Sequence, residues 1–273
     1  MKVNQYLYEY LMESDEEAYR LDLKTVESVV KKQAFWSGIK PGMRVADIGC
    51  GSGKITTVLH KLIQPDGVVV GVDGSEKRIE YAKERYGFNG IEFKCKNILE
   101  PLDDLGMFDF VWVRFLLEYY RSNSFDIVKD ISAIVRPGGI LCLIDLDHNC
   151  LSHFGLSKKL ERTILALMRH LEETANFDPY VGRKLYSFLY DLGYKDIKLD
   201  VSVHHLIFGE LKDTDAFNWF KKVEVISRKI NYQFEEYEGG YEEFLEEFNK
   251  FFTDPRRFTY TPIISCKGNK PVI

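Results

Sequence analysis

Cysteine is scarce in this sequence and forms no recognisable pattern. The five cysteines are widely spaced, odd in number and without a C-x-x-C pair; they are Cys50, Cys95, Cys142, Cys150 and Cys266. Such a set suits neither a disulfide framework nor a structural zinc site. We therefore expect all five thiols to be reduced, and most of them to be buried as small apolar groups.

Long hydrophobic runs are also missing. The longest candidate, residues 131–144, is interrupted by Arg136 and by the turn at 137–139. It falls short of the roughly 18 apolar residues that a membrane helix needs. The amino-terminal residues are acidic, whereas a secretory signal begins with basic residues and continues with an apolar stretch. These absences predict a cytoplasmic protein with no membrane insertion.

The chain has no excess of basic residues. It carries 37 Lys and Arg against 42 Asp and Glu, which gives a formal net charge of −5. The overall field therefore repels a phosphate backbone. The glutamates concentrated between residues 235 and 247 are typical of a solvated helix face. We expect no nucleic-acid partner.

Short β-branched runs alternate with amphipathic ones between residues 43 and 146, a pattern that predicts βαβ units around a parallel sheet. The five strands predicted there are residues 43–49, 67–73, 91–96, 108–114 and 139–147. Two further strands are predicted at 194–208 and 258–268. The region is therefore the α/β core of the chain.

Helical periodicity flanks and interrupts this core. Apolar residues recur at helical spacing in 25–36, in 160–171 and in the long segment 211–255, which separates the last two strands. Within that segment one face is aromatic and aliphatic, and it comprises Tyr241, Phe244, Leu245, Phe248, Phe251 and Phe252.

The motif VADIGCGSGKIT, residues 45–56, places Gly49, Gly51 and Gly53 between a strand and a helix. Glycine lets the backbone turn tightly and approach a ligand closely, and the helix start favours an anionic group. Asp73 ends the next strand, where a carboxylate can accept the hydroxyls of a ribose. Together these residues predict an adenosine pocket.

Two other nucleotide motifs do not match. A dinucleotide-binding G-x-G-x-x-G loop would need its third glycine at position 54, where the sequence has Lys54 and the glycine comes one residue earlier. The phosphate-binding pattern G-x-x-x-x-G-K-[ST] does not occur.

In their order and spacing, DIGCGSG, GVDGS, FDFVWVRFLLEYY and VRPGGILCLID resemble the class I S-adenosylmethionine-dependent methyltransferases. The similarity covers roughly residues 40–203 and the last strand. It is greatest to the small-molecule branch that includes ubiquinone and menaquinone biosynthesis methyltransferases. The resemblance implies a Rossmann-like, doubly wound α/β fold with a seven-stranded, mostly parallel sheet whose last strand is antiparallel.

The resemblance also implies S-adenosylmethionine as cofactor, S-adenosylhomocysteine as product, and a set of binding residues. Gly49, Cys50 and Gly51 would contact the methionine and ribose portion, with Asp47 bracing the loop, and Asp73 would take the ribose hydroxyls. The other members implied are Gly74, Asn97 and Ile98 around the adenine, with Arg114 and Phe115 beside the methionine. Asn97 stands where many members have Asp, and its amide keeps one acceptor oxygen.

Methyl transfer from a sulfonium is an in-line displacement, so the protein mainly aligns the reactants and excludes water. If the acceptor is protonated, a base is needed, and we name His148 as the first candidate and Tyr119 as the second. Asp145 and Asp147 suggest a divalent metal, but Arg114 occupies the position of a further carboxylate ligand, so we expect no metal.

The histidine pair His204 and His205 lies in a predicted strand, where neighbouring side chains face opposite sides. We therefore do not expect both to face one ligand. Within one domain, we expect a methyltransferase core at 41–210 and 256–273. Residues 1–40 and the insertion 211–255 are expected to cap the acceptor pocket, where aromatic walls suit a flat small molecule and a sulfonium.

Three functions remain open at this point. The motifs and the acidic balance favour a methyltransferase whose partner is a small-molecule acceptor. The shared core alone would also allow a protein or RNA methyltransferase, or a non-catalytic protein that binds S-adenosylmethionine. The acceptor atom and the oligomeric state cannot be predicted from these residues.

Overall fold

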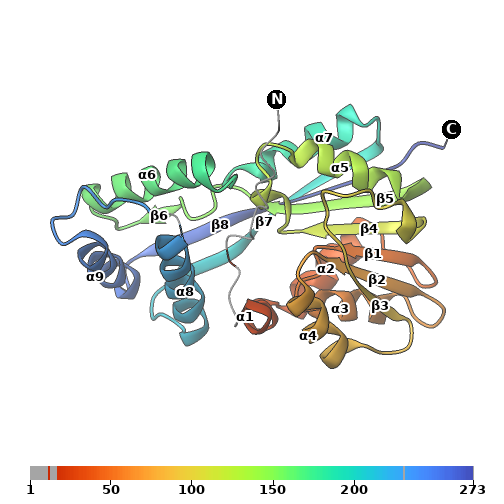
Figure 1. Cartoon of the computed structure of the whole chain (residues 1–273), viewed down its shortest axis with the longest axis horizontal. Coiled ribbons are helices and arrows are strands. Elements are labelled where there is room, and N and C mark those ends of the chain that lie inside the picture. Colours follow the sequence, from red (N-terminus) through yellow and green to blue (C-terminus); the bar gives the residue numbers. More distant parts are fainter. Residues whose placement is uncertain (1–11, 13–16, 230, 273) are drawn as a thin grey trace.

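The computed structural model describes residue 12, residues 17–229 and residues 231–272, and its centre is one twisted sheet (Figure 1). The strands are β1 Arg44–Ile48, β2 Val68–Asp73, β3 Ile91–Cys95, β4 Phe108–Arg114, β5 Val135–Leu146, β6 His153–Phe154, β7 Lys195–Phe208 and β8 Phe258–Asn269. Their order is β3-β2-β1-β4-β5-β8-β6, and β7 also pairs with β8.

The pairing directions confirm the predicted topology. Strands β3, β2, β1, β4 and β5 are mutually parallel, and β8 runs antiparallel to both β5 and β7. All seven predicted strands are present. The structure adds β6, a two-residue strand on β8 that is too short to leave a period-2 signal in the sequence.

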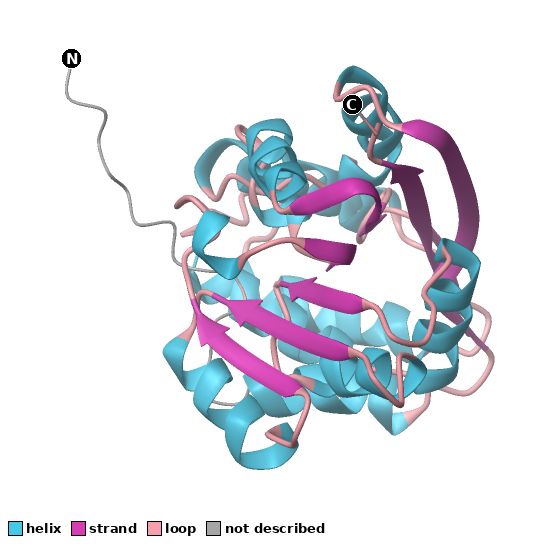
Figure 2. Cartoon of the chain, turned by 90° about the vertical axis from the view of Figure 1, so that its right-hand side faces the viewer, coloured by secondary structure: helices cyan, strands magenta, loops and turns pink. Residues whose placement is uncertain are grey.

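Helices cover both faces of the sheet, as a doubly wound fold requires (Figure 2). They are α1 Glu17–Lys24, α2 Glu27–Ser37, α3 Lys54–Leu62, α4 Glu76–Tyr86, α5 Ser124–Ala133, α6 Lys158–Thr174, α7 Leu185–Asp191, α8 Asp213–Lys229 and α9 Gly240–Thr253. Helices α2 and α3 pack on one face, against Val45, Val69 and Trp112. Helices α5 and α7 pack on the other, against Ala46, Val70 and Val111.

The alternation of neighbouring strand residues between two cores explains why the strands are apolar throughout. Val45 and Ala46 are adjacent in β1, are both fully buried, and belong to different hydrophobic clusters. Parallel strands covered on both faces have this continuous apolar character. The three glycines at the end of β1 therefore lie at the edge of a rigid scaffold.

A second hydrophobic core lies beyond the parallel strands. Strands β7 and β8 extend beyond the parallel strands, and their far ends lie near α6, α8 and α9 (Figure 1). The aromatic residues Trp219, Phe248 and Phe252 pack there, and the predicted apolar face of 160–171 is buried on α6. We call α6, α8 and α9 the cap; α8 and α9 lie within the segment 211–255.

Helix α1 bridges the cap and the core. The carbonyl of Asp22 accepts a hydrogen bond from Lys54 Nζ at 2.7 Å, and its carboxylate accepts one from Tyr86 Oη at 2.8 Å. On its other side α1 contacts α8. Of the predicted amino-terminal helices, α1 and α2 are thus observed, whereas residues 1–11 and 13–16 lie outside the described residues.

Two composition-based expectations can be compared with the described chain. All five cysteines are free and only Cys95 is exposed, which confirms the reduced, mostly buried set. Within residues 17–229 and 231–272, no helix combines the length and the apolar character needed to cross a membrane.

Candidate functional site

A cavity of about 1200 Å³ opens at the carboxyl ends of the parallel strands. The loops that follow β1, β2, β3 and β4 form its walls, and Leu21, Lys24 and Thr25 of the α1 region cover part of it. Ligands of open α/β sheets bind at this edge. The predicted cofactor residues that line it are Gly49, Cys50, Gly51, Asp73, Gly74, Asn97, Ile98, Arg114 and Phe115.

The glycine loop after β1 is held by backbone hydrogen bonds to β2 and is in contact with α1. The amides of Gly49 and Cys50 both donate to the carbonyl of Val72, at 2.8 and 2.9 Å. Gly51 has φ of 54°, and a Cβ at this position would lie 2.9 Å from Leu21 Cδ1. Only glycine therefore allows α1 to approach the loop this closely.

The Asp73 carboxylate connects three segments of the cavity wall. Its Oδ2 accepts the Gly51 amide at 2.9 Å, and its Oδ1 accepts the Ser75 amide and Arg78 Nε, both at 3.0 Å. A carboxylate oxygen can accept more than one hydrogen bond, so Oδ2 can accept a ligand hydroxyl in addition to the Gly51 amide. Sequence reasoning found Asp73 but missed Arg78, whose only signal is its place in the first turn of α4.

Asp47 lies in β1 just before the glycine loop and does not line the cavity, so its bracing role stays a prediction. Its side chain is buried, and Thr56 Oγ1 donates to Oδ2 at 2.6 Å. Burial raises the pKa of Asp47 to about 7, although the Thr56 hydrogen bond opposes this shift. The carboxyl is therefore held by β1 beneath the site in a poorly solvated environment.

The segment after β3 forms the outer end of the cavity. Ile98 is buried beside the sheet, whereas Asn97 is exposed and its Oδ1 accepts the backbone amide of Leu99 at 3.1 Å. This bond orients the Asn97 side chain and leaves one lone pair on the same oxygen. An apolar wall next to a fixed acceptor suits the face and the amine of an aromatic heterocycle.

The end of β4 forms the inner wall of the cavity. Phe115 has φ of 57°, unusual for an aromatic residue, and its amide donates to the carbonyl of Ile144 at 2.9 Å. The Arg114 guanidinium lies 3.9 Å from the centre of the Phe115 ring. Burial lowers the pKa of Arg114 to about 10, against the opposing effects of Asp145 and Asp47. The group nevertheless remains a cation near neutral pH.

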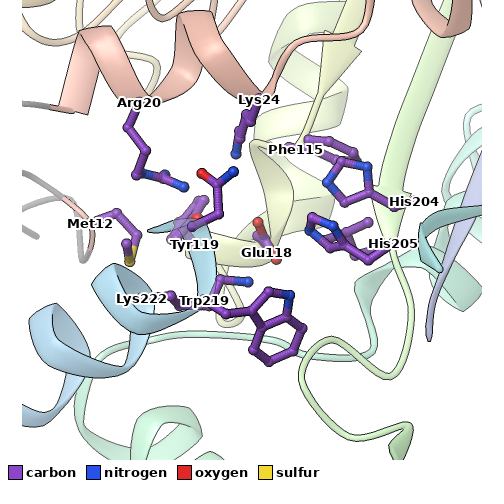
Figure 3. Close-up of a pocket in the computed structure, with 12 residues that line it drawn as sticks. Met12, Arg20, Lys24, Phe115, Glu118, Tyr119, His204, His205, Trp219 and Lys222 are labelled. Carbon is purple, nitrogen blue, oxygen red and sulfur yellow. The ribbon is translucent and has the colours of Figure 1, made fainter. Parts of the chain in front are cut away.

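A second, much smaller cavity of about 20 Å³ lies behind this wall (Figure 3). We call it the inner chamber. It shares Lys24, Phe115 and Tyr119 with the large cavity. Its remaining lining comes from Met12 and from α1, β5, β7, α8 and the turn after β4. The residues of these elements are Arg20, Glu118, Leu146, His204, His205, Asn218, Trp219 and Lys222.

Asp145 fixes the turn after β4, residues 117–119, at the boundary between the two cavities. Its carboxylate accepts the amides of Leu117 at 2.9 Å and Leu146 at 2.8 Å. Glu118, the next residue of the turn, accepts Asn149 Nδ2 at 2.6 Å. Burial raises the pKa of both Glu118 and Asp145, and their mutual repulsion adds to the shift of Asp145.

The two aspartates considered as metal ligands have other partners. Asp145 holds the turn, and Asp147 forms an ion pair with Arg183 at 2.8 Å. Among the described residues, no group of three or more His, Cys, Asp or Glu side chains is arranged to hold a metal ion.

The expectation for the histidine pair was wrong. The pairing of β7 with β8 shifts register between Val203 and His205, and such a bulge breaks the alternation of side chains. His204 and His205 both line the inner chamber, with ring centres 4.1 Å apart. Burial lowers the pKa of His205 to about 3 and that of His204 well below its usual value, so both rings are neutral near pH 7.

The two candidate bases occupy different places. His148 is exposed, packs edge-on against Tyr180 with ring centres 5.3 Å apart, and lines neither cavity. Tyr119 lines both cavities, and it makes a hydrogen bond with Glu118 that lowers the pKa of that carboxyl. The structure thus brings Tyr119, but not His148, to the boundary between the cavities.

Comparison with known proteins supports the family indicated by this geometry. The family model described as "Methyltransferase domain" matches residues 39–187, which is more than half of the chain. These residues contain β1 to β5, the glycine loop and the turn after β4. The chain belongs to this family of S-adenosylmethionine-dependent methyltransferases.

Individual relatives agree with this membership. The demethylmenaquinone methyltransferase of Bacillus cytotoxicus is 32% identical over 110 residues, which cover 38% of this chain and 46% of the relative. The chain spans less than half the length of the curated relatives that it matches.

Two solved structures share the fold over most of this chain. Phosphoethanolamine N-methyltransferase 2 of Haemonchus contortus covers 89% of the chain, with 52% of its own length, at 15% identity and a TM-score of 0.53. Coclaurine N-methyltransferase covers 88%, with 72% of its own length, at 17% identity and a TM-score of 0.52.

We predict that the substitution Asp47→Asn changes how stability depends on pH. The folded-state pKa of Asp47, about 7, exceeds its usual value of 3.8. Wild-type protein therefore loses stability at this site as the pH rises through that interval. Asn keeps an acceptor for Thr56 but has no charge to bury. Urea unfolding measures the free energy of unfolding of both proteins. The value for the variant minus the value for wild type should increase as the pH rises from 3.8 to about 7.

The exposed residue Asp66 supplies a matched control, because Asp66→Asn removes a carboxylate that is already solvated. Its effect on the free energy of unfolding should not vary with pH. If the Asp47→Asn difference were equally independent of pH, the buried carboxyl would not have a raised pKa.

Proposed function

We propose that this protein transfers the methyl group of S-adenosylmethionine to a small-molecule acceptor. The observation that carries the proposal is that two cavities meet at one wall, formed by Phe115, Tyr119 and Lys24. The large cavity has room for the donor, and the acceptor approaches the same wall from the cap side. Reactants held in this way no longer need to find each other in solution.

The residues of the large cavity fit the cofactor in three respects. The free acceptor capacity of Asp73 Oδ2 matches a ribose hydroxyl, and Ile98 and Asn97 match the face and amine of adenine. Gly49 and Gly51 allow the methionine portion to approach the backbone next to Arg114. When bound there, the cofactor would supply a methyl group activated by its attachment to a sulfonium. In-line displacement would transfer this methyl group and release S-adenosylhomocysteine as a neutral thioether.

The closed acceptor side supports a small molecule over a protein or an RNA. Helices α1 and α8 contact each other across the inner chamber, and Trp219 of α8 is buried beneath them. A macromolecular substrate needs an open groove, and the net charge of −5 opposes binding of RNA. The Bacillus cytotoxicus relative is named for methylation of a small molecule, demethylmenaquinone.

The chain's own residues align the acceptor and exclude water. Phe115 and Tyr119 form the wall where the two reactants meet, and the Arg114 guanidinium covers one face of the Phe115 ring. The Tyr119 hydroxyl, bonded to Glu118, can pass a proton from the acceptor toward that carboxylate. On this support we propose Tyr119 for the catalytic role, with His148 outside the reaction.

We predict that Asp73→Asn weakens binding of S-adenosylhomocysteine by about 1–3 kcal/mol, which is roughly fivefold to 150-fold. The substitution removes an ionised acceptor and leaves Arg78 without its ion pair. Calorimetric titration measures the affinity, with Asp103→Asn as an exposed control and NAD as a ligand expected not to bind. Binding of NAD, or unchanged affinity in the Asp73 variant, would contradict the placement of the cofactor.

A transfer assay separates the proposed activity from its alternatives. Purified protein is incubated with methyl-labelled S-adenosylmethionine and either a metabolite extract or a macromolecular extract. We expect label in the metabolite fraction. Label confined to protein or RNA would favour a macromolecular substrate. Binding of the cofactor without transfer to either fraction would favour a non-catalytic role.

We predict that Tyr119→Phe lowers kcat about tenfold or more, because the hydroxyl that bonds to Glu118 is lost. His148→Ala should leave kcat within about twofold of wild type, since its side chain lines neither cavity. Steady-state kinetics with the acceptor found above measures both. A larger loss in the His148 variant would restore it as the candidate base.

A further inference from the structure

The inner chamber carries an excess of positive charge. Arg20 and Glu17 neutralise each other through two hydrogen bonds of 2.7 Å. Among the described residues that line the chamber, Lys24 and Lys222 then face a single carboxylate, Glu118. When both lysines are protonated, one positive charge of this described set remains uncompensated with Glu118 ionised, and two remain with Glu118 protonated. Buried charge without a partner is costly, so this arrangement favours an anionic ligand.

The two lysines differ in their partners. Lys24 makes no hydrogen bond and no ion pair within the described part of the chain. Lys222 Nζ has two long contacts, each of 3.5 Å, with Asn149 Oδ1 and Cys150 Sγ. Burial, together with the nearby Arg20, lowers the pKa of Lys24 to about 7, and Lys222 adds to that effect. Repulsion from Arg20 and Lys222 thus adds to the effect of burial on the Lys24 ammonium, and an anion beside it would oppose both effects.

Two buried polar atoms of the lining also lack partners among the described residues. They are Trp219 Nε1, a donor, and Asn218 Oδ1, an acceptor. In Figure 3 the indole nitrogen lies on the edge of the ring that faces Glu118 and His205. Buried polar atoms are rarely left unpaired in folded proteins, so a polar group from outside the chain is expected here.

The size of the inner chamber limits what this group can be. A volume of about 20 Å³ exceeds the roughly 10–15 Å³ needed for one water molecule only slightly. A whole metabolite does not fit, whereas the two oxygens of a carboxylate are of suitable size. A tetrahedral phosphate, with three terminal oxygens, is larger than this space.

We propose that the methyl acceptor carries a carboxylate, which binds in the inner chamber between the ammonium groups of Lys24 and Lys222 and accepts the Trp219 Nε1 hydrogen. This inference rests on the proposed function and specifies its substrate class. The rest of the acceptor extends past Phe115 and Tyr119 toward the large cavity (Figure 3). The carboxylate is thus an anchor, and the atom that receives the methyl group lies at the shared wall.

Lys222 is the decisive residue for testing this anchor. Lys24 lines both cavities, so its loss could also affect the cofactor, whereas Lys222 lines only the inner chamber. The adjacent Lys221 provides a matched control on the same helix, because it lines neither cavity and pairs with Glu224 instead. Lys222→Arg retains the charge, and Trp219→Phe removes the indole donor together with part of the buried ring.

The first experiment is calorimetric titration of benzoate into protein saturated with S-adenosylhomocysteine. We expect benzoate to bind and its neutral isostere benzamide and the larger phenyl phosphate not to bind. Lys222→Met should weaken benzoate binding about tenfold or more, with partial recovery in Lys222→Arg. Lys221→Met should leave it within about twofold, and both methionine variants should bind S-adenosylhomocysteine as wild type does.

Absence of benzoate binding, or equal binding of benzamide, would show that the chamber holds water and would overturn the inference. Tighter binding of phenyl phosphate would assign the site to a phosphate and overturn it equally. If Lys222→Met fails to fold, Trp219→Phe takes its place and should likewise weaken binding of benzoate.

The second experiment uses the charge of the natural product as readout. Labelled small molecules from the transfer assay are passed over an anion exchanger at pH 8, and we expect the label to be retained. Label in the flow-through would overturn the carboxylate anchor while leaving methyl transfer intact. Failure of S-adenosylhomocysteine to bind, or absence of any labelled small molecule, would instead remove the proposed function, and the inference with it.

Discussion

The hydrogen bonds of the Asp73 carboxylate are the constraint on which the donor site depends. They connect the glycine loop after β1, the start of α4 and the end of β2 through one side chain. A carboxylate that accepts several hydrogen bonds is held in one orientation. The shape of the cavity and its acceptor for a ribose hydroxyl therefore have the same physical origin.

The acceptor side is built by a different principle. Its polar groups come from α1, β7 and α8, segments that the chain brings together only through the cap. Asp145 fixes the turn that carries Glu118 and Tyr119 by accepting backbone hydrogen bonds. The large cavity is thus formed mainly by loops after the parallel strands, whereas the inner chamber is formed mainly by α1, β7 and α8.

The sequence predicted much of the lining of the large cavity, because the information for that lining is local. Buried parallel strands can be recognised in a sequence as apolar runs, and their carboxyl ends lie at one edge of the sheet. Gly49, Gly51 and Asp73 could therefore be placed at a common cavity from their positions alone. Arg78 could not, because an arginine in an exposed-looking helix gives no sign of the carboxylate it meets.

The inner chamber escaped prediction for the opposite reason. Lys24 and Lys222 are separated by most of the chain, and each resembles an ordinary charged residue of an amphipathic helix. The bulge that turns His204 and His205 to one side leaves no trace in a pattern of alternating residues. His148 follows β5, as the sequence predicted. Its backbone has a φ of 50°, and its side chain is exposed at the surface.

The central claim is that donor and acceptor meet at the wall shared by the two cavities. A crystal structure of the complex with S-adenosylhomocysteine tests it most directly. The account predicts a ribose hydroxyl within hydrogen-bond distance of Asp73 Oδ2, and the sulfur atom facing Phe115 and Tyr119. A sulfur atom directed away from that wall, or a ligand bound outside the large cavity, would contradict it.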